Sequence, residues 1–281
     1  MVVPFSKVGI WGVGLIGGSI GLALKREGGA VEIIGIGRSE ERLRKACRLG
    51  IVDKYACNPD ALQGCELVIL ATPVEQIVEA LGSLGGHLRP GTVVTDVGST
   101  KRTICEAAWR SLPETVEFIG GHPVAGREVA GLENSLPGLF ENAAYVFCPK
   151  PGSFSGNLRR LESFAEILGA RPFVMTPEEH DRAIARVSHL PQLLSTALAN
   201  VAGSERTDIS GSGLRDMLRL AGSPYSIWEG IFQSNRDNID LALVEFIRHL
   251  EQVRRLLVQD GLREEFEAAD MIHRRIRKSS T

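Results

Sequence analysis

The chain has 281 residues, 43% of them hydrophobic and 23% charged, as in ordinary globular proteins, and this length predicts one or two domains. Its formal net charge of −2 excludes a basic module that binds nucleic acid or an anionic membrane through bulk electrostatics. The five cysteines are odd in number and form no C-x-x-C pair, and no stretch approaches the roughly 20 apolar residues of a membrane span, so we expect a cytoplasmic protein without a metal site.

The first predicted unit is a strand, a glycine turn and a helix. Lys7 to Trp11 is a short apolar run, glycines follow in G-x-G-x-x-G spacing, and Ile16 to Leu24 is typical of an apolar helix. In that spacing the first glycine allows a tight turn, the second lets the backbone approach a pyrophosphate, and the third lets helix and strand pack. The free N–H groups at the helix start favour phosphate. The alternative is that these glycines form a turn with only a structural role and bind no dinucleotide. The candidate cofactor contacts are Gly12, Gly14, Leu15, Ile16 and Gly17.

The second predicted strand, Val31 to Ile36, bears on the choice of cofactor. An acidic residue at the end of this strand would hold the adenosine ribose, but Gly37 stands there and Arg38 and Ser39 follow. A guanidinium and a hydroxyl suit a 2′-phosphate, which favours NADP over NAD. The alternative is that Ser39 caps a helix from Glu40 to Leu49 and Arg38 faces solvent.

Two further buried strands are expected at Leu67 to Ala71 and Val93 to Val97. Strands alternating with helices predict a parallel sheet with helices on both faces, whose ligands bind beyond the carboxyl ends of the strands. Ser99 therefore lies where a substrate or the nicotinamide ribose is expected. It also suits the N-cap of a helix at Ile104 to Trp109, and both interpretations can hold. The strand ends add three cofactor candidates, which are Thr72, Pro73 and Asp96.

His122 is the strongest candidate for a general base among the six histidines. It lies in a predicted rigid loop from Gly121 to Glu128, where Pro123 biases its backbone towards an extended conformation. His189, on an apolar helix, fits a pocket or a packed core equally well. The segments after this loop predict a strand at Tyr145 to Cys148, a helix at Leu158 to Leu168 and a strand at Arg171 to Met175.

From Thr176 onward the pattern is helical. Thr176, Pro177 and Glu179 form the signature of a capping box, and Pro191 predicts a kink further along. We therefore expect a dinucleotide-binding domain at residues 1–175 and an all-helical domain at residues 176–281. The helical domain carries more apolar surface than a small bundle can bury, which suggests a partner subunit. One long helix shows this in the stripe Ile239, Ala242, Leu243, Phe246, Leu250, Val253 and Leu257.

Three segments give the chain a family resemblance. GGHPVAGRE around residues 120–128, EEHDRAIARVSHLPQ at 178–192 and LRDMLRLAGSPYSIWEGIFQSN at 214–235 resemble those of prephenate dehydrogenases, within the prephenate, arogenate and cyclohexadienyl dehydrogenase group of tyrosine biosynthesis. The resemblance covers nearly the whole chain in order. It implies a Rossmann domain, a helical domain that forms a homodimer, and oxidative decarboxylation of prephenate to 4-hydroxyphenylpyruvate with hydride transfer to NAD(P).

The resemblance also implies roles for single residues. His122 takes the proton of the substrate hydroxyl, and Ser99 supports that hydroxyl or the nicotinamide. Arg219 binds a substrate carboxylate, although an i,i+3 ion pair with Asp216 is also available to it. The remaining substrate candidates are His189 and Gln192, which line the pocket, Arg127, which contacts a carboxylate or faces solvent, and Glu128, which forms with Asp216 an ionic gate around Arg219.

Three rival functions stay open. Gln192 stands where relatives carry histidine, so an arogenate or dual-substrate dehydrogenase is an alternative. A β-hydroxyacid dehydrogenase would need a catalytic lysine in the helical domain, and residues 176–270 contain none. A non-catalytic NADP-sensing protein would not need His122, Ser99 and Arg219 together.

Overall fold

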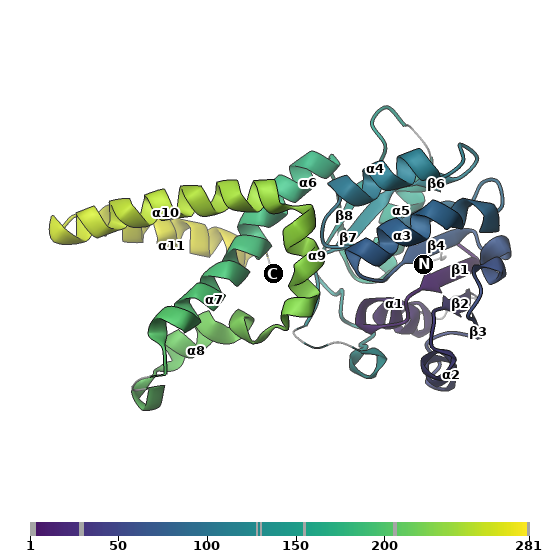
Figure 1. The fold of residues 1–281 in the computed structure, drawn as a ribbon, viewed down its shortest axis with the longest axis horizontal. Coiled ribbons are helices and arrows are strands. Elements are labelled where there is room, and N and C mark those ends of the chain that lie inside the picture. The colour runs from purple at the N-terminus through teal and green to yellow at the C-terminus, as the bar shows by residue number, and fades with distance from the viewer. Residues whose placement is uncertain are drawn as a thin grey trace.

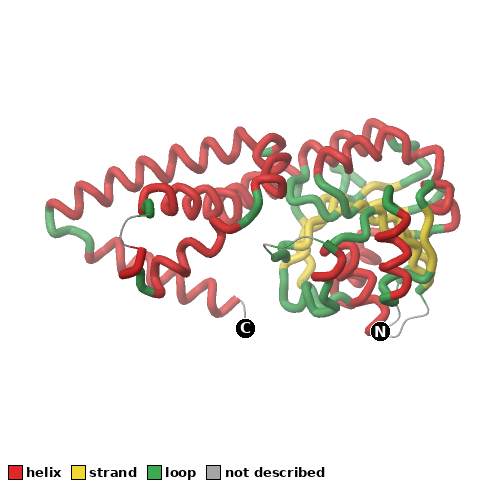
Figure 2. The backbone as a smooth tube through the Cα atoms, turned by 60° about the horizontal axis from the view of Figure 1, so that its bottom comes forward, coloured by secondary structure: helices red, strands yellow, loops and turns green. Residues whose placement is uncertain are grey.

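The computed structural model describes residues 4–27, 31–127, 129, 131–153, 156–204 and 207–279. The chain forms two lobes, one of strands covered by helices and one built of helices alone (Figures 1 and 2). Among the described residues, none of the helices combines the length and the hydrophobicity that a membrane span requires.

A six-stranded parallel sheet organises the first lobe. Its order is β3-β2-β1-β4-β5-β6, so the chain first builds outward from β1 to one side and then returns to build the other side. The predicted parallel sheet of a Rossmann-type fold is thereby confirmed, and its topological switch point lies between β1 and β4. The strands are β1 Lys7–Trp11, β2 Glu32–Ile36, β3 Lys54–Ala56, β4 Leu67–Leu70, β5 Val93–Asp96 and β6 Glu117–Phe118.

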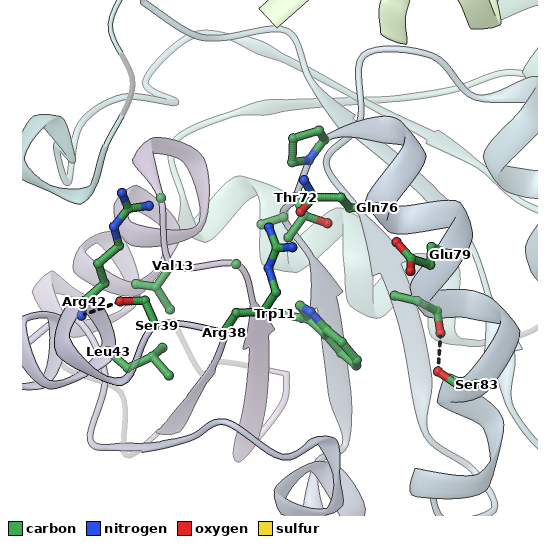
Figure 3. Close-up of a pocket in the computed structure, with 16 residues that line it drawn as sticks. Trp11, Val13, Arg38, Ser39, Arg42, Leu43, Thr72, Gln76, Glu79 and Ser83 are labelled. Carbon is green, nitrogen blue, oxygen red and sulfur yellow. Dashed lines mark hydrogen bonds between the residues drawn. The ribbon is translucent and has the colours of Figure 1, made fainter. Parts of the chain in front are cut away.

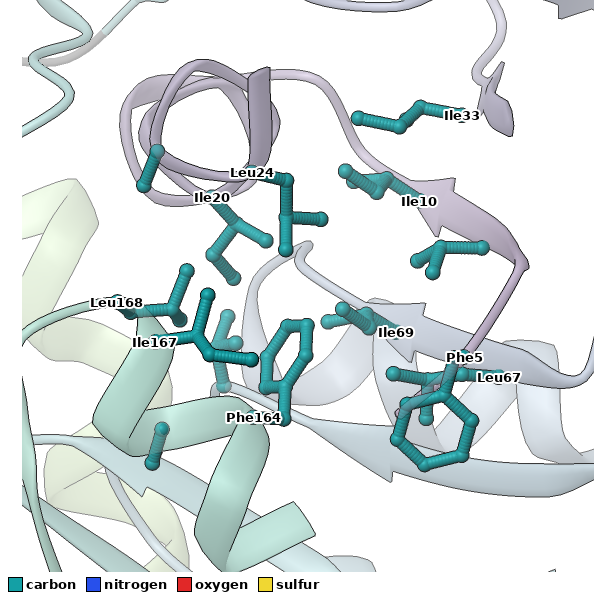
Figure 4. Packing of buried hydrophobic residues seen from close by; sticks show 14 of the residues in the cluster. Phe5, Ile10, Ile20, Leu24, Ile33, Leu67, Ile69, Phe164, Ile167 and Leu168 are labelled. Atoms are coloured by element: carbon teal, nitrogen blue, oxygen red, sulfur yellow. The ribbon is translucent and has the colours of Figure 1, made fainter. Parts of the chain in front are cut away.

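Helices bury both faces of this sheet, because its central strands are apolar on both sides. In β4, Leu67 and Ile69 pack on one face, whereas Val68 and Leu70 pack on the other. Figure 4 shows the first face, where α1 and α5 meet the strands. The opposite face is covered by α3 and α4. The helices of this lobe are α1 Leu15–Arg26, α2 Glu40–Arg48, α3 Val74–Leu84, α4 Arg102–Ser111 and α5 Gly156–Ile167, with short 3₁₀ turns at Pro59–Gly64, Gly85–His87 and Leu132–Asn134.

A second, three-stranded sheet lies beside the first. It joins β7 Gly120–Pro123 to β8 Ala144–Cys148 in antiparallel register and β8 to β9 Arg171–Val174 in parallel register. The prediction of a loop from Gly121 is therefore wrong in its first part, since His122 lies on a strand opposite Val146. Local sequence favoured a turn, but pairing with a strand more than 20 residues away fixes the backbone. His122 is consequently held by a sheet.

The second lobe begins at the predicted capping box, in which the Thr176 hydroxyl accepts from the N–H of Glu179 and the Glu179 carboxylate accepts from the N–H of Thr176. The predicted kink is a π-helical turn, Ala185–His189, just before Pro191. A π turn bends a helix and changes which side chains face inward. The helices are α6 Pro177–Ile184, α7 Leu190–Ala202, α8 Ser212–Leu218, α9 Tyr225–Ser234, α10 Arg236–Val258 and α11 Arg263–Ser279, with 3₁₀ turns at Thr207–Ile209 and Arg219–Gly222.

The predicted apolar stripe lies on α10, but the chain itself buries only its first two members, Ile239 and Ala242. Beyond them α10 extends away from the first lobe, with α11 alongside (Figure 1). Large apolar side chains stay exposed along both helices, namely Leu241, Val244, Ile247, Leu250, Leu257, Val258, Phe266, Met271, Ile272 and Ile276.

The start of α4 joins the two lobes. The Arg102 guanidinium donates through both terminal nitrogens to the Asp237 carboxylate of α10, each at 2.8 Å. The hydroxyls of Thr100 and Ser234 of α9 lie 2.8 Å apart. These contacts fix the helical lobe against the carboxyl edge of the sheet.

Candidate active site

The glycine turn has the geometry predicted for it. Gly12 adopts φ +102°, and a Cβ there would lie 2.6 Å from the carbonyl oxygen of Ala71. A Cβ on Gly17 would overlap the carbonyl oxygen of Gly12, so this glycine permits close packing of helix and strand. A Cβ on Gly14, by contrast, would meet no atom within 4 Å, which leaves open space at the helix N-terminus. This arrangement fits a bound pyrophosphate.

A cavity of about 560 Å³ opens at the switch point of the sheet (Figure 3). Most of the cofactor candidates line it, which are Gly12, Gly14, Arg38, Ser39, Thr72 and Pro73. Leu15, Ile16 and Gly17 form the first turn of α1 next to it, where backbone N–H groups have no partner within the helix. Its size and its glycine-lined end suit a dinucleotide.

Arg38, Ser39 and Arg42 form one polar side of this cavity, and polar residues of α3, among them Glu79, line another. The hydroxyl of Ser39 accepts from the N–H of Arg42 at 3.4 Å, so the predicted capping role of Ser39 is confirmed, and the same residue lines the cavity. Figure 3 shows the two arginine side chains on either side of Ser39. Arg42, in the first turn of α2, is a second cation that sequence reasoning missed.

Asp96 lies elsewhere than predicted. It is fully buried, does not line the cavity, and forms an ion pair with Lys101, which is also fully buried. The Asp96 carboxylate further accepts from the N–H of Gly98 at 2.8 Å and of Gly121 at 3.0 Å. The ammonium of Lys101 also donates to the Gly121 carbonyl at 2.7 Å. This pair ties the end of β5 to the start of β7.

Three buried side chains form a row joined by short polar contacts: His122, His180 and Asp181. Nδ1 of His122 lies 2.8 Å from Nε2 of His180, and Nδ1 of His180 lies 2.8 Å from Oδ1 of Asp181. Asp181 also accepts from the N–H groups of Lys101 and Arg102, at 2.7 and 3.0 Å. Because Asp181 caps α4 from the other lobe, the alternative that Ser99 caps this helix is wrong. Ser99 lies half-buried beyond the end of β5.

Burial keeps these histidines neutral at pH 7. It lowers the pKa of His122 well below its ordinary value, and repulsion from the protonated forms of His180 and His189 and from the Lys101 ammonium lowers it further. Burial likewise lowers the pKa of His180, although Asp181 acts in the opposite direction. The pKa of His189 falls to about 4, again through burial first. A neutral imidazole at position 122 can act as a base.

These depressed pKa values predict acid destabilisation. Below about pH 6.5 the unfolded chain binds protons at its histidines that the folded chain does not, so the free energy of unfolding falls as the pH drops to about 4. His189 alone accounts for about 3 kcal/mol of that loss. Urea unfolding of the wild type and of His189→Gln across this range isolates the share of His189. A difference in the free energy of unfolding between the two proteins that does not change with pH would contradict the prediction.

His189 and Gln192 lie together at the start of α7. Nδ1 of His189 lies 3.3 Å from the Asn235 amide, and its ring meets Trp228 edge-on at 6.0 Å. The Gln192 amide donates to the carbonyl of Leu220 at 3.0 Å, which orients its oxygen away from that carbonyl. Nε2 of His189 and Oε1 of Gln192 are buried and have no hydrogen-bond partner among the described residues. Unpaired buried polar atoms are costly, so both call for a polar ligand.

The remaining candidates lie around this cluster. Arg219 is exposed at the start of the 3₁₀ turn whose Leu220 carbonyl holds Gln192, and Asp216 is exposed one turn earlier on α8. Arg127 is exposed in the segment after β7. Glu128 lies outside the described residues. No group of three His, Cys, Asp or Glu side chains in the described ranges is arranged to hold a metal ion.

Sequence reasoning missed His180, Asp181 and Lys101. His180 and Asp181 stand within the segment EEHDRAIARVSHLPQ, directly after the capping box. A histidine followed by an aspartate at a domain junction was the available signal, but its partner is 58 residues away in sequence. Lys101 lies next to Thr100 in the predicted turn, and its burial could not be read from local polarity.

Comparisons with known proteins find relatives that match most of this chain. The family models for the nucleotide-binding domain and the dimerization domain of prephenate dehydrogenase match residues 20–174 and 176–269. The prephenate dehydrogenase of Bacillus subtilis is 33% identical over 89% of this chain and 69% of its own length. The Aquifex aeolicus prephenate dehydrogenase, solved with hydroxyphenyl propionate and NAD⁺, is 30% identical with a TM-score of 0.86, covering 97% of this chain and 98% of that one. The Synechocystis arogenate dehydrogenase is 32% identical with a TM-score of 0.82, covering 97% and 99%.

Proposed function

Because this chain belongs to the prephenate dehydrogenase family, we propose that it catalyses the oxidative decarboxylation of prephenate to 4-hydroxyphenylpyruvate with NAD(P), in tyrosine biosynthesis. The observation that carries the proposal is the neutral, buried His122, held by His180 at the junction of the lobes. One lobe supplies the dinucleotide cavity, and the other supplies the buried polar cluster around Gln192.

The protein's part in the chemistry follows from these positions. The nicotinamide, when bound, supplies the hydride acceptor for C4 of the cyclohexadienol ring. His122 accepts a hydrogen bond from the C4 hydroxyl and takes its proton as carbonyl character develops. The ring carboxylate leaves as CO₂, the electron pair of the broken bond completes the aromatic ring, and the ring oxygen takes the proton back from His122 to form the phenol. Aromaticity makes this step effectively irreversible.

The other residues orient the substrate. Ser99, beyond the end of β5, is proposed to support the C4 hydroxyl or the nicotinamide. Arg219 binds a substrate carboxylate through its planar fork, and His189 lines the same pocket. Arg127 is proposed to contact a substrate carboxylate, and Glu128 to form with Asp216 an ionic gate around Arg219.

Gln192 favours arogenate as a second candidate substrate. Its amide nitrogen is committed to the Leu220 carbonyl, so the group it leaves buried and unpartnered is an acceptor oxygen. An acceptor pairs with the ammonium of arogenate better than with the keto oxygen of prephenate. A dehydrogenase that accepts both substrates is therefore the alternative.

Absorbance at 340 nm tests both substrates at once. Purified protein is mixed with prephenate or arogenate and with NAD or NADP, in all four pairings. Turnover with prephenate supports the main proposal, and turnover with arogenate alone supports the alternative. Cofactor binding without turnover in any pairing would contradict both and favour a sensor.

We expect NADP to be preferred over NAD, since two arginines and a hydroxyl line the cavity where an acidic residue would hold the ribose. Arg38→Ala or Arg42→Ala should lower kcat/KM for NADP roughly 10- to 100-fold, as loss of a charged hydrogen bond, and leave kcat/KM for NAD within a few fold. Arg44→Ala is the matched control, because Arg44 lies on the same helix, pairs with Glu40 and does not line the cavity. Equal losses with both cofactors would contradict this preference.

We further propose that residues 1–175 form the dinucleotide-binding domain and residues 176–281 the substrate and dimerization domain. The change from strands to helices after β9 and the ranges of the two family models support this division. The five cysteines are free thiols, as expected in the reducing cytoplasm, where we propose the enzyme works.

The chain is proposed to form a homodimer through the exposed apolar side chains of α10 and α11. In a twofold interface, Leu250→Glu removes one buried leucine from each copy, so the dissociation constant should rise at least about 100-fold. Sedimentation velocity measures this shift. Leu49 is an exposed leucine of the other lobe, so Leu49→Glu is the control and should leave the mass of the sedimenting dimer unchanged. A dimer unaffected by Leu250→Glu would contradict an interface on α10.

A further inference from the structure

We propose that His180 and Asp181 are positioning residues that fix His122 in the tautomer whose bare Nε2 accepts the substrate proton. This inference rests on the proposed function of His122 as the general base. It is carried by the unbroken row of contacts from Asp181 through His180 to His122, each at 2.8 Å. The three side chains come from two lobes, with His122 on β7 and the other two on α6.

The direction of the hydrogen bonds is set at Asp181. Its Oδ1 accepts from the N–H of Lys101, and its Oδ2 accepts from the N–H of Arg102. A backbone N–H can only donate, so both oxygens act as acceptors, as in an ionised carboxylate. The N-terminus of α4 further favours negative charge at this position. The remaining contact of Oδ1, to His180, must therefore be a hydrogen bond that Nδ1–H of His180 donates.

The tautomer of His122 follows from that direction. A neutral imidazole carries one proton, so a His180 protonated at Nδ1 has a bare Nε2 that can only accept. Its partner, Nδ1 of His122, must then carry a proton and donate it. His122 is thereby left with a bare Nε2. Burial lowers the pKa values of both rings, which keeps each in the neutral form that this reasoning requires.

The exposed fractions of the three side chains show that His122, which carries the bare Nε2, is the outermost member of the row. Asp181 is 0% exposed, His180 is 1% exposed and His122 is 7% exposed. Only His122 therefore retains accessible surface from which it can meet a substrate. The rings of His122 and His180 meet edge-on at an interplanar angle of 72°, which suits a bond between ring nitrogens.

The row also stabilises the charge that forms when His122 works. When Nε2 takes the hydroxyl proton, His122 becomes an imidazolium with protons on both nitrogens. Its Nδ1–H continues to donate to His180, and Nδ1–H of His180 continues to donate to Asp181, so no further proton has to move. The carboxylate of Asp181 then stabilises the new positive charge through His180, as a buried aspartate does behind a catalytic histidine.

Nitrogen-15 NMR of the histidine rings tests the tautomer without turnover. In labelled wild-type protein near pH 7, the His122 signals, assigned by their loss in His122→Asn, should report a proton on Nδ1 and a bare Nε2. In His180→Ala the signals should shift to the Nε2–H form or to a mixture. A wild-type His122 protonated at Nε2 would overturn the proposal, whichever substrate the enzyme uses.

Kinetics test the consequence in the intact enzyme. His180→Ala should lower kcat about 10- to 10³-fold. KM should stay within about threefold of the wild-type value, since His122 loses its correct tautomer but the contacts that bind the substrate stay. His180→Gln, whose amide oxygen can accept from Nδ1–H of His122, should recover most of that loss. His87→Ala is the matched control, because His87 also pairs with an aspartate, Asp60, at 2.6 Å, outside the site.

Two kinetic outcomes would overturn the positioning role. One is a normal kcat for His180→Ala, and the other is an equal loss in His180→Gln and His180→Ala. Unchanged circular dichroism and cofactor affinity in both variants exclude unfolding as the cause. Absence of turnover in the wild type would instead count against the proposed function, and the NMR result would still decide the tautomer.

Discussion

Replacing His122 with asparagine is expected to lower kcat roughly 10²- to 10⁴-fold, the usual contribution of a general base. Asparagine is close to histidine in polarity but cannot take a proton at neutral pH, so the chemical step loses its acceptor. The substrate carboxylates still find their partners, and KM should stay within a few fold. Steady-state kinetics with saturating cofactor measure both constants.

His87→Asn is the control for this experiment. His87 lies in a 3₁₀ turn of the first lobe, bonded to Asp60, and belongs to neither the cavity nor the row of buried histidines. Its replacement should leave kcat unchanged. A nearly normal kcat for His122→Asn would remove His122 from the mechanism, and with it the proposed role of His180.

Replacing Arg219 with alanine is expected to raise KM for the substrate roughly 10- to 150-fold while changing kcat far less. A hydrogen bond to a charged group contributes about 1.5–3 kcal/mol, and a carboxylate bound alike in the ground and transition states affects KM alone. Arg219 begins the 3₁₀ turn whose next residue, Leu220, accepts a hydrogen bond from the Gln192 amide, so both residues belong to the same part of the helical lobe.

Arg219→Lys separates charge from shape. Lysine keeps the positive charge but cannot form the two parallel hydrogen bonds of a guanidinium, so its KM should lie between those of wild type and Arg219→Ala. Arg159→Ala, an exposed arginine of α5, controls for net charge and should leave KM unchanged. An unaltered KM in Arg219→Ala would assign the carboxylate to another cation.

Local sequence predicted the features that local chemistry decides. The glycine turn, the capping of α2 by Ser39 and the capping box at Thr176 each depend on residues within a few positions of one another. The alternating strands and helices likewise predicted the parallel sheet. In all these cases, backbone freedom and nearby hydrogen bonds fix the structure.

Features that depend on distant partners were not predictable in this way. His122 was expected in a loop because glycines and a proline surround it, but pairing with β8 makes it part of a strand. Ser99 had the sequence context of an N-cap, yet Asp181, about 80 residues away, provides the cap. Asp96 was expected at the cofactor, but it is paired with Lys101 in the interior. Tertiary contacts decided each of these positions.

The division of the buried row between two lobes affects how a newly made chain becomes an enzyme. The nucleotide cavity is built entirely from residues before position 84, whereas the side chains that orient His122 arrive with α6. Chains emerge from the ribosome N-terminus first, and domains fold as units. The nascent protein therefore gains its dinucleotide pocket well before its base is correctly oriented. The ability to catalyse hydride transfer comes last, when docking of the helical lobe completes both the capping of α4 and the orientation of His122.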